Sequence, residues 1–396
     1  MRRLTVALVF GGRSGEHEVS CVSARHVAAA LDPERYEVIP IGITREGRWM
    51  LPDASRTVLE GGALEIPPSA FEADGLPVTI VHDPGRMDLV ALHACESAPE
   101  ERPSLRKIDV AFPVLHGPFG EDGTVQGLFE LAGIPYVGAG VLGSALGMDK
   151  EKMKRLFRSE GLPTVDFVVL RAPEWSLEQE RLLKEAEALG FPCFTKPANL
   201  GSSIGISKCC DAASLVAGIE EAFRHDRKVL VEEAIPGREV ECGVLGNDFP
   251  EASLVGEILP GRDFYDYVAK YVDQSSEVVI PAHLPEAIVD LVREYALTAF
   301  RAIDAAGMAR VDFFYEEGGR GVVVNEINTI PGFTPISMFA KLWDATGIAY
   351  PQMIDRLISL ALERHRARPR SEDIPPPRAN RARQGGPGPA RPGSFD

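Results

Sequence analysis

Glu326 and Asn328 have the clearest potential for chemistry, because side chains two positions apart in a strand share one face. They lie in the run 322–328, whose alternation predicts a strand with Val323 and Ile327 on the opposite face. A carboxylate beside an amide oxygen is a ligand pair that suits a hard cation. The pattern therefore points to a cation site, with a solvated strand face as the alternative.

A second alternating run precedes the first, and the Gly-rich segment between them predicts an antiparallel hairpin. A turn centred near Gly319 sets Asp312 opposite Glu326. The same register sets Arg310 opposite Asn328. Four polar side chains on one sheet face are costly to bury without partners, so a bound cation with phosphate oxygens explains them better than a dry core.

The composition bounds the class of protein. The 396 residues suffice for two or three domains, and 42 basic against 58 acidic side chains give a net charge of −16. This balance argues against a nucleic-acid or anionic-membrane partner. The six cysteines show no C-x-x-C pair and no disulfide-like spacing, which indicates reduced thiols and a cytoplasmic protein. Residues 4–10 have the pattern of a first strand rather than a signal peptide, and no apolar stretch reaches the roughly 20 residues of a membrane span.

Polar groups gather at the carboxyl ends of two predicted parallel strands, residues 4–10 and 110–115. Glu16 follows the first strand, where its carboxylate could hold a substrate ammonium group or simply stabilise the next helix. His116 and Glu121 follow the second strand, although a lone histidine at a turn is more often structural. The loop after the first strand lacks G-x-G-x-x-G, so a dinucleotide site is only weakly supported.

A lysine and a run of small residues predict a phosphate-binding loop. Lys196 ends a predicted strand, and residues 198–206 let backbone N–H groups approach phosphate oxygens, although the Walker A pattern is absent. Glu239 follows a strand that passes into an extended linker, where it could bind ribose hydroxyls. A flexible turn is the alternative for the loop, and solvated lysines are the simple explanation of a lysine-rich helix at 148–157.

Three further segments differ from these strands and helices in composition. Residues 263–272 are polar and aromatic without a period, which predicts a closing loop with Lys270 and Tyr271 as its ligand contacts. Residues 44–106 are irregular and predict a peripheral insertion with short strands. Residues 366–396 are rich in Pro and Arg and almost free of apolar side chains, so we expect a disordered tail.

Together these motifs resemble those of the D-alanine–D-alanine ligases of the ATP-grasp superfamily, over residues 4–363. The resemblance rests on signatures that occur in the expected order: GGRSGEHEVS at Gly11, LHGPFGEDGTVQG at Leu115, MDK at Met148, KPANLGSSIG at Lys196, VEEAIPGREVECGV at Val231, FYDYVAKY at Phe264, ARVDFF at Ala309 and NEINTIPGFTPIS at Asn325.

The resemblance implies an α/β and α+β fold with a three-domain ATP-grasp architecture. A Rossmann-like substrate domain would span 1–147, a central ATP-grasp domain 148–235 and a C-terminal catalytic ATP-grasp domain 236–365, before the tail at 366–396. Proteins of this family are cytoplasmic homodimers that use ATP and D-alanine, so the same is expected here.

Matched by position, the signatures imply a role for each of their polar residues. Two Mg²⁺ ions, with Mn²⁺ as a substitute, would be held by Asp312, Glu326 and Asn328. ATP would be bound by Lys150, Lys196, Ser202, Glu232, Glu233, Ile235, Glu239 and Lys270. The two D-alanine substrates would be bound by Glu16, His116, Arg310, Gly332, Ser337 and Met338. Catalytic roles are implied for Glu16, Ser202, Tyr271, Arg310 and Gly332.

The implied reaction has two steps and supplies the dipeptide for peptidoglycan. ATP phosphorylates the first D-alanine to D-alanyl phosphate, and the amine of the second D-alanine attacks it. Arg310 and the Gly332 N–H would stabilise the tetrahedral oxygen. Tyr271 implies an amide product, because the ester-forming ligases of the family carry Phe there or a His in a differently spelled loop. The vicinal Cys209-Cys210 lies outside the resemblance.

Two other functions fit parts of the sequence. An oxidoreductase with a nucleotide cofactor is suggested by the first strand, loop and helix, but the missing G-x-G-x-x-G counts against it. A non-catalytic ATP-binding regulator could use the same scaffold, but every matched catalytic position is filled.

Overall fold

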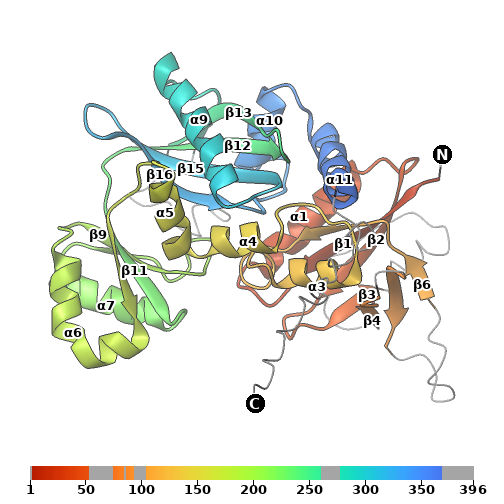
Figure 1. Ribbon diagram of the computed structural model, residues 1–396, viewed down its shortest axis with the longest axis horizontal. Helices are drawn as coiled ribbons and strands as arrows, with labels where there is room; N and C mark the ends of the chain where they lie inside the picture. Colours follow the sequence, from red (N-terminus) through yellow and green to blue (C-terminus); the bar gives the residue numbers. More distant parts are fainter. Residues whose placement is uncertain (1, 53–74, 84–85, 93–103, 260–276, 368–396) are drawn as a thin grey trace, which may run out of the picture.

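The computed structural model describes residues 2–52, 75–83, 86–92, 104–259 and 277–367. In these ranges the chain forms three sheets with helices packed against them (Figure 1). The predicted closing loop with Lys270 and Tyr271 lies outside the described residues, and so do residues 368–396 of the predicted tail. Residues 366 and 367, predicted as the start of that tail, instead end the last helix. Among those described, no helix is both long enough and apolar enough to cross a membrane.

The first sheet has the strand order β6-β5-β4-β3-β2-β1-β7. Its strands are β1 (Leu4–Gly11), β2 (Tyr36–Ile43), β3 (Trp49–Pro52), β4 (Gly75–Ile80), β5 (Asp88–Ala91), β6 (Ser104–Lys107) and β7 (Val110–Val114). The strand β1 pairs in parallel with β2 and β7, and it is almost fully buried, as its continuous apolar run predicts. The loops that carry Glu16 and His116 therefore leave the sheet side by side, at the carboxyl ends of β1 and β7. The predicted short strands of the insertion are β3 to β6, which extend this sheet.

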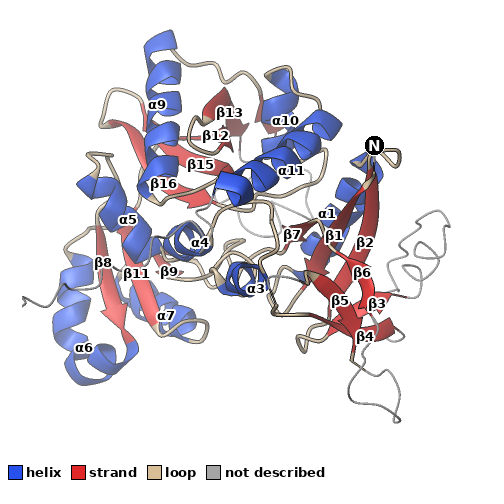
Figure 2. Cartoon of the chain, turned by 45° about the vertical axis from the view of Figure 1, so that its right-hand side comes forward, coloured by secondary structure: helices blue, strands red, loops and turns tan. Residues whose placement is uncertain are grey.

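The helices α1 (His17–Ala30) and α3 (Thr124–Ala132) pack against the parallel part of this sheet. The helix α4 (Val141–Met148) lies beside α3 and contacts the third sheet. The last helix, α11 (Tyr350–Ala367), also contributes to this region. Its Met353 and Leu357 belong to one hydrophobic core with Val6 and Phe112 of the first sheet, and Trp343 of α10 (Met338–Ala345) is part of the same core. Leu245 and Met308 of the third sheet belong to this core too, so the first and third sheets share it. Figure 2 shows α11 between these two sheets. The domain boundaries remain a prediction.

The second sheet is antiparallel, with the order β10-β9-β11-β8. Its elements are β8 (Phe167–Arg171), α6 (Ala172–Glu187), β9 (Cys193–Pro197), β10 (Ser207–Cys209), α7 (Ala212–Phe223) and β11 (Lys228–Glu233). Cys193, Cys209 and apolar residues of both helices form the core on one face. Alternation along β9 then turns Phe194 and Lys196 to the other face, where both line a cavity.

The third sheet is antiparallel, with the order β14-β13-β12-β15-β16. Its elements are β12 (Arg238–Gly246), β13 (Glu251–Leu259), β14 (Glu277–Val279), α9 (Glu286–Ala302), β15 (Gly307–Glu316) and β16 (Gly321–Asn328). The helices α9 and α5 (Lys150–Ser159) pack on one face and bury its main core. Asp312 and Glu326 of the hairpin β15–β16 point to the opposite face, where they line a cavity together with residues of the second sheet.

The predicted register of the hairpin is confirmed: Asp312 pairs with Glu326, and Arg310 pairs with Asn328. One detail of the prediction is wrong. The register shifts by one residue beyond Asp312, which inserts Asn325 as a bulge in β16. The core on one face therefore contains Val324 together with Ile327, where strict alternation had placed Val323.

Candidate active site

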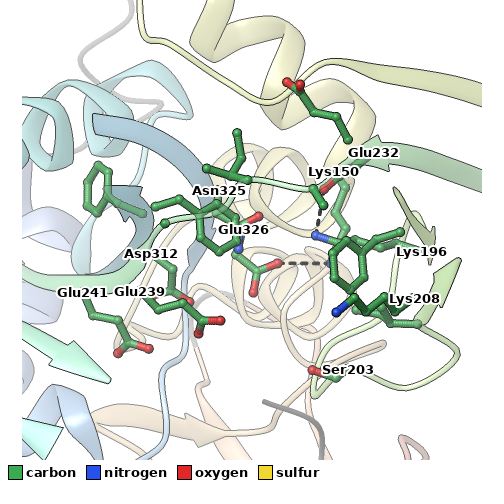
Figure 3. A pocket seen from close by; sticks show the side chains of 18 of the residues that line it. Lys150, Lys196, Ser203, Lys208, Glu232, Glu239, Glu241, Asp312, Asn325 and Glu326 are labelled. Carbon is green, nitrogen blue, oxygen red and sulfur yellow. Dashed lines mark ion pairs between the residues drawn. The ribbon is translucent and has the colours of Figure 1, made fainter. Parts of the chain in front are cut away.

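A cavity of about 660 Å³ lies between the second and third sheets. Figure 3 shows Lys196 and Lys208 on one side, Glu239, Glu241 and Asp312 on the other, and Glu326 between them. The cavity is lined by residues of β9, β11, β12, β15 and β16, and by the loop from Leu200 to Ser203. Predicted site residues found in this lining are Lys150, Lys196, Ser202, Glu232, Glu233, Ile235, Glu239, Asp312 and Glu326.

Two of the three lysines predicted to bind ATP, Lys150 and Lys196, approach this cavity from different elements. Lys150 begins α5 and donates a hydrogen bond from Nζ to the Leu200 carbonyl at 2.7 Å, while its Nζ lies 3.6 Å from Glu326. The Lys196 Nζ lies 2.7 Å from Glu232. Burial alone would lower the pKa of Lys196, but the charges of Glu232 and Glu326 outweigh it and raise that pKa. Both lysines therefore offer positive charge to a phosphate group.

Lys154 is a buried site residue that the sequence reasoning missed. Its Nζ donates to the Asn325 carbonyl at 2.8 Å and lies 3.3 Å from Glu232. Burial lowers its pKa to about 8. The expectation of solvated lysines is wrong for Lys154, which lies four residues after Lys150 and so shares its helix face. That spacing was the available signal.

The carboxylate of Glu232 joins two of these lysines. One of its oxygens faces Lys154 and the other faces Lys196. Burial would raise the pKa of Glu232, but the two ammonium groups outweigh it and lower that pKa. This buried network fixes Lys196 relative to α5 and to the bulge of β16 at Asn325.

The three predicted metal ligands meet where β15 and β16 pair. Asp312 receives two hydrogen bonds of 2.7 Å from the Arg310 guanidinium, and the Asn328 amide donates to it at 3.0 Å. Asp312 and Glu326 are directly opposite, and Lys150 lies beside Glu326 as Arg310 does beside Asp312. Two carboxylates and an amide oxygen, reached by turning the Asn328 amide, are the donors that Mg²⁺ prefers. The residues present therefore fit a magnesium site.

Glu16 lies beside the glycines of two loops. It is buried, and Ser202 donates a hydrogen bond to its Oε1. A Cβ atom at Gly117 would lie 2.7 Å from Glu16 Oε2, and one at Gly201 would lie 2.8 Å from the same atom. Only glycine allows both backbones to approach this carboxylate so closely. The structure thus brings the predicted pair Glu16 and Ser202 together across two sheets.

His116 and Glu121 connect the first sheet to the segment after β16. His116 Nδ1 lies 3.0 Å from the Ile330 carbonyl, a contact in which the ring donates. Burial lowers the pKa of His116, so the ring is neutral at pH 7. Glu121 accepts backbone hydrogen bonds from Gly117 at 2.8 Å and from Ile330 at 3.0 Å. Burial, with the charge of Glu16, raises the pKa of Glu121 to about 8.

The predicted second-substrate residues lie at the start of α10. Ser337 precedes the first residue of that helix, Met338, and its hydroxyl donates to the carbonyl groups of Gly332 and Thr334 at 2.7 Å each. This contact closes the turn after β16. The N–H groups of the first helical turn have no partner within their helix and suit an anion such as a carboxylate.

Two family models cover most of the chain. The D-ala D-ala ligase N-terminus model matches residues 5–139, and the D-ala D-ala ligase C-terminus model matches residues 156–359. The chain belongs to the D-alanine–D-alanine ligase family. This confirms the resemblance inferred from the signatures, and it makes the chain an ATP-dependent ligase whose co-substrate is ATP.

Other ligases of this family match nearly the whole chain. The D-alanine–D-alanine ligase of Halothermothrix orenii is 48% identical over 364 residues, which is 92% of this chain and 99% of that protein. The solved VanG D-Ala:D-Ser ligase of Enterococcus faecalis is 38% identical with a TM-score of 0.77, covering 91% of this chain and all of that one. The D-alanine–D-alanine ligase of Coxiella burnetii is 36% identical with a TM-score of 0.75, covering 92% and 96%. These structures confirm the expected ATP-grasp fold.

Proposed function

We propose that this ligase joins two D-alanine molecules into D-alanyl-D-alanine through a D-alanyl phosphate, as a step of peptidoglycan precursor synthesis. The observation that carries the proposal is the cavity in which Lys150 and Lys196 approach Glu326, at the positions of the family's signatures. A carboxylate is a poor electrophile, so converting it to an acyl phosphate supplies the activation that amide formation needs.

ATP would lie in the cavity between the second and third sheets. Lys150 and Lys196 would neutralise its phosphate oxygens, and the backbone where β11 ends would meet the purine edge. Glu239 faces the same cavity and would bind the ribose hydroxyls. Lys270, outside the described residues, would add a third phosphate contact. Positioning and charge neutralisation are the main protein contributions to phosphoryl transfer.

Asp312, Glu326 and Asn328 would hold two Mg²⁺ ions, for which Mn²⁺ would substitute. When bound, such ions offset the charge on the phosphoryl group being transferred. The carboxylate of Glu326 also lies close to Lys150, so the metal-binding strand and the phosphate-binding helix meet at one point.

Glu16 would bind the ammonium group of the first D-alanine. Glu16 is buried, and it forms a small polar region with Ser202 and His116 at the carboxyl ends of β1 and β7. Ser202 would link Glu16 to Tyr271 when the closing loop covers the site. Closure would protect the acyl phosphate from water.

The second D-alanine would be held through its carboxylate by Ser337 and the Met338 amide. Its amine would then attack the acyl phosphate, and the oxyanion would be stabilised by Arg310 and the Gly332 N–H. Loss of one such donor costs on the order of 10²–10³ in rate.

We also propose, from the family resemblance, that the protein is a cytoplasmic homodimer. Sedimentation of the full chain at micromolar concentration would test the dimer.

The substrate assignment is tested by phosphate release from ATP with D-alanine, L-alanine, D-serine and D-lactate, with products identified by mass. D-serine belongs in the panel because the similar VanG protein of Enterococcus faecalis is a D-Ala:D-Ser ligase. We expect the amide D-alanyl-D-alanine as the main product, in keeping with Tyr271. Faster turnover with D-lactate near neutral pH would contradict that assignment, and phosphate release independent of any amino acid would contradict the ligase reaction.

A further inference from the structure

The Arg310 guanidinium lies between two carboxylates on neighbouring strands. Its Nε and Nη2 donate to the two oxygens of Asp312 at 2.7 Å each, and Nε also lies 2.8 Å from Glu241 Oε2. Glu241 of β12 pairs directly with Asp312 of β15. The side chains of Arg310, Asp312 and Glu241 are only 17%, 14% and 8% exposed. Water therefore screens this triad weakly.

The geometry of Arg310 sets up a competition. Its Nε carries a single hydrogen, which Asp312 Oδ1 accepts, although Glu241 Oε2 is almost equally near. Both oxygens of Asp312 accept a hydrogen bond from the guanidinium, and Oδ2 accepts another from Asn328, so a divalent cation competes with Arg310 for the lone pairs of Asp312. A released, buried guanidinium without a carboxylate partner would be costly.

We propose that Glu241 is a positioning residue that receives the Arg310 Nε–H when Asp312 turns to a divalent cation. This inference rests on the proposed function, in which Asp312 is a metal ligand. The exchange keeps a carboxylate on Arg310 throughout and leaves its remaining N–H groups for the oxyanion of the second step.

The test measures binding of Mn²⁺ to the full chain in the presence of ADP and without D-alanine. Binding is detected as a loss of the electron paramagnetic resonance signal of free Mn²⁺. Glu241→Gln should weaken Mn²⁺ binding roughly tenfold, because the amide oxygen can still accept the Nε–H but lacks the negative charge that strengthens a bond from a guanidinium. Glu241→Asp, which keeps the charge, should recover part of the affinity. The matched control is Glu257→Gln, because Glu257 pairs with Arg238 at 2.7 Å in the same sheet but does not line the cavity.

A double-mutant cycle separates this role from a simple effect of charge. In an Arg310→Met background no guanidinium competes for Asp312, so Glu241→Gln should no longer weaken Mn²⁺ binding. An undiminished tenfold loss in that background, or unchanged binding in the single variant Glu241→Gln, would overturn the inference. Asp312→Asn tests the metal site separately from the role of Glu241. If this variant binds Mn²⁺ as well as the unmodified chain, the proposed metal site fails too.

Discussion

Replacing Lys154 by methionine should destabilise the fold and weaken ATP binding together. The change keeps a long apolar stem but removes the hydrogen bond to the Asn325 carbonyl at 2.8 Å and the contact with Glu232 at 3.3 Å. Removing one partner from a buried ion pair typically costs about 3–5 kcal/mol. Glu232 keeps a second partner, Lys196, at 2.7 Å. The loss in free energy of unfolding should therefore lie at the lower end, about 3 kcal/mol.

Urea unfolding followed by fluorescence measures this loss, and steady-state kinetics measures the KM for ATP. Lys152→Met is the matched control, because the Lys152 side chain is 52% exposed on the same helix. We expect the KM for ATP to rise in Lys154→Met. Lys154 contacts both Glu232, which holds Lys196, and the Asn325 carbonyl next to Glu326, and the variant loses both contacts. A free energy of unfolding for Lys154→Met within about 0.5 kcal/mol of the control would refute the reasoning.

Two further variants test the substrate side of the site. Gly201→Ala should raise the KM for D-alanine, because its Cβ would lie 2.8 Å from Glu16 Oε2; Gly127→Ala, whose Cβ would meet nothing within 4 Å, should leave that KM unchanged. Glu121 has an ordinary pKa of 4.5 and a folded pKa of about 8, so the folded state holds its proton more tightly and the stability contributed by this group falls as pH rises from about 4.5 to 8. Glu121→Gln should remove that decline from thermal unfolding measured between pH 5 and 8, and parallel pH curves for both proteins would contradict the assignment.

The sequence was sufficient to predict the hairpin because its geometry is local. A short Gly-rich turn determines which residues face each other, and the pairs Asp312–Glu326 and Arg310–Asn328 follow. The Asn325 bulge was missed although Asn325 interrupts the alternation, because a polar residue at an apolar position does not by itself distinguish a bulge from a hydrogen-bonded side chain. The contact between Arg310 and Asp312 could be predicted from the sequence, because residues two positions apart in a strand share a face.

Features that depend on contacts far apart in sequence were harder to predict. Lys154 looked solvated because its partners, Glu232 and the Asn325 carbonyl, come from two other elements. The packing of α11 against the first sheet is likewise invisible in an amphipathic pattern, which shows that a helix has an apolar face but not what covers it. The role of Glu121 as a link to Ile330 depends on the same kind of distant contact.

The central claim is that the cavity between the second and third sheets carries out ATP-dependent ligation with Glu326 as a metal ligand. The most direct measurement compares D-alanine-dependent phosphate release from ATP, with dipeptide quantified by mass, in the unmodified chain and in Glu326→Ala. We predict equal amounts of phosphate and D-alanyl-D-alanine from the unmodified chain and a loss of both in the variant. Undiminished phosphate and dipeptide from Glu326→Ala would contradict the claim.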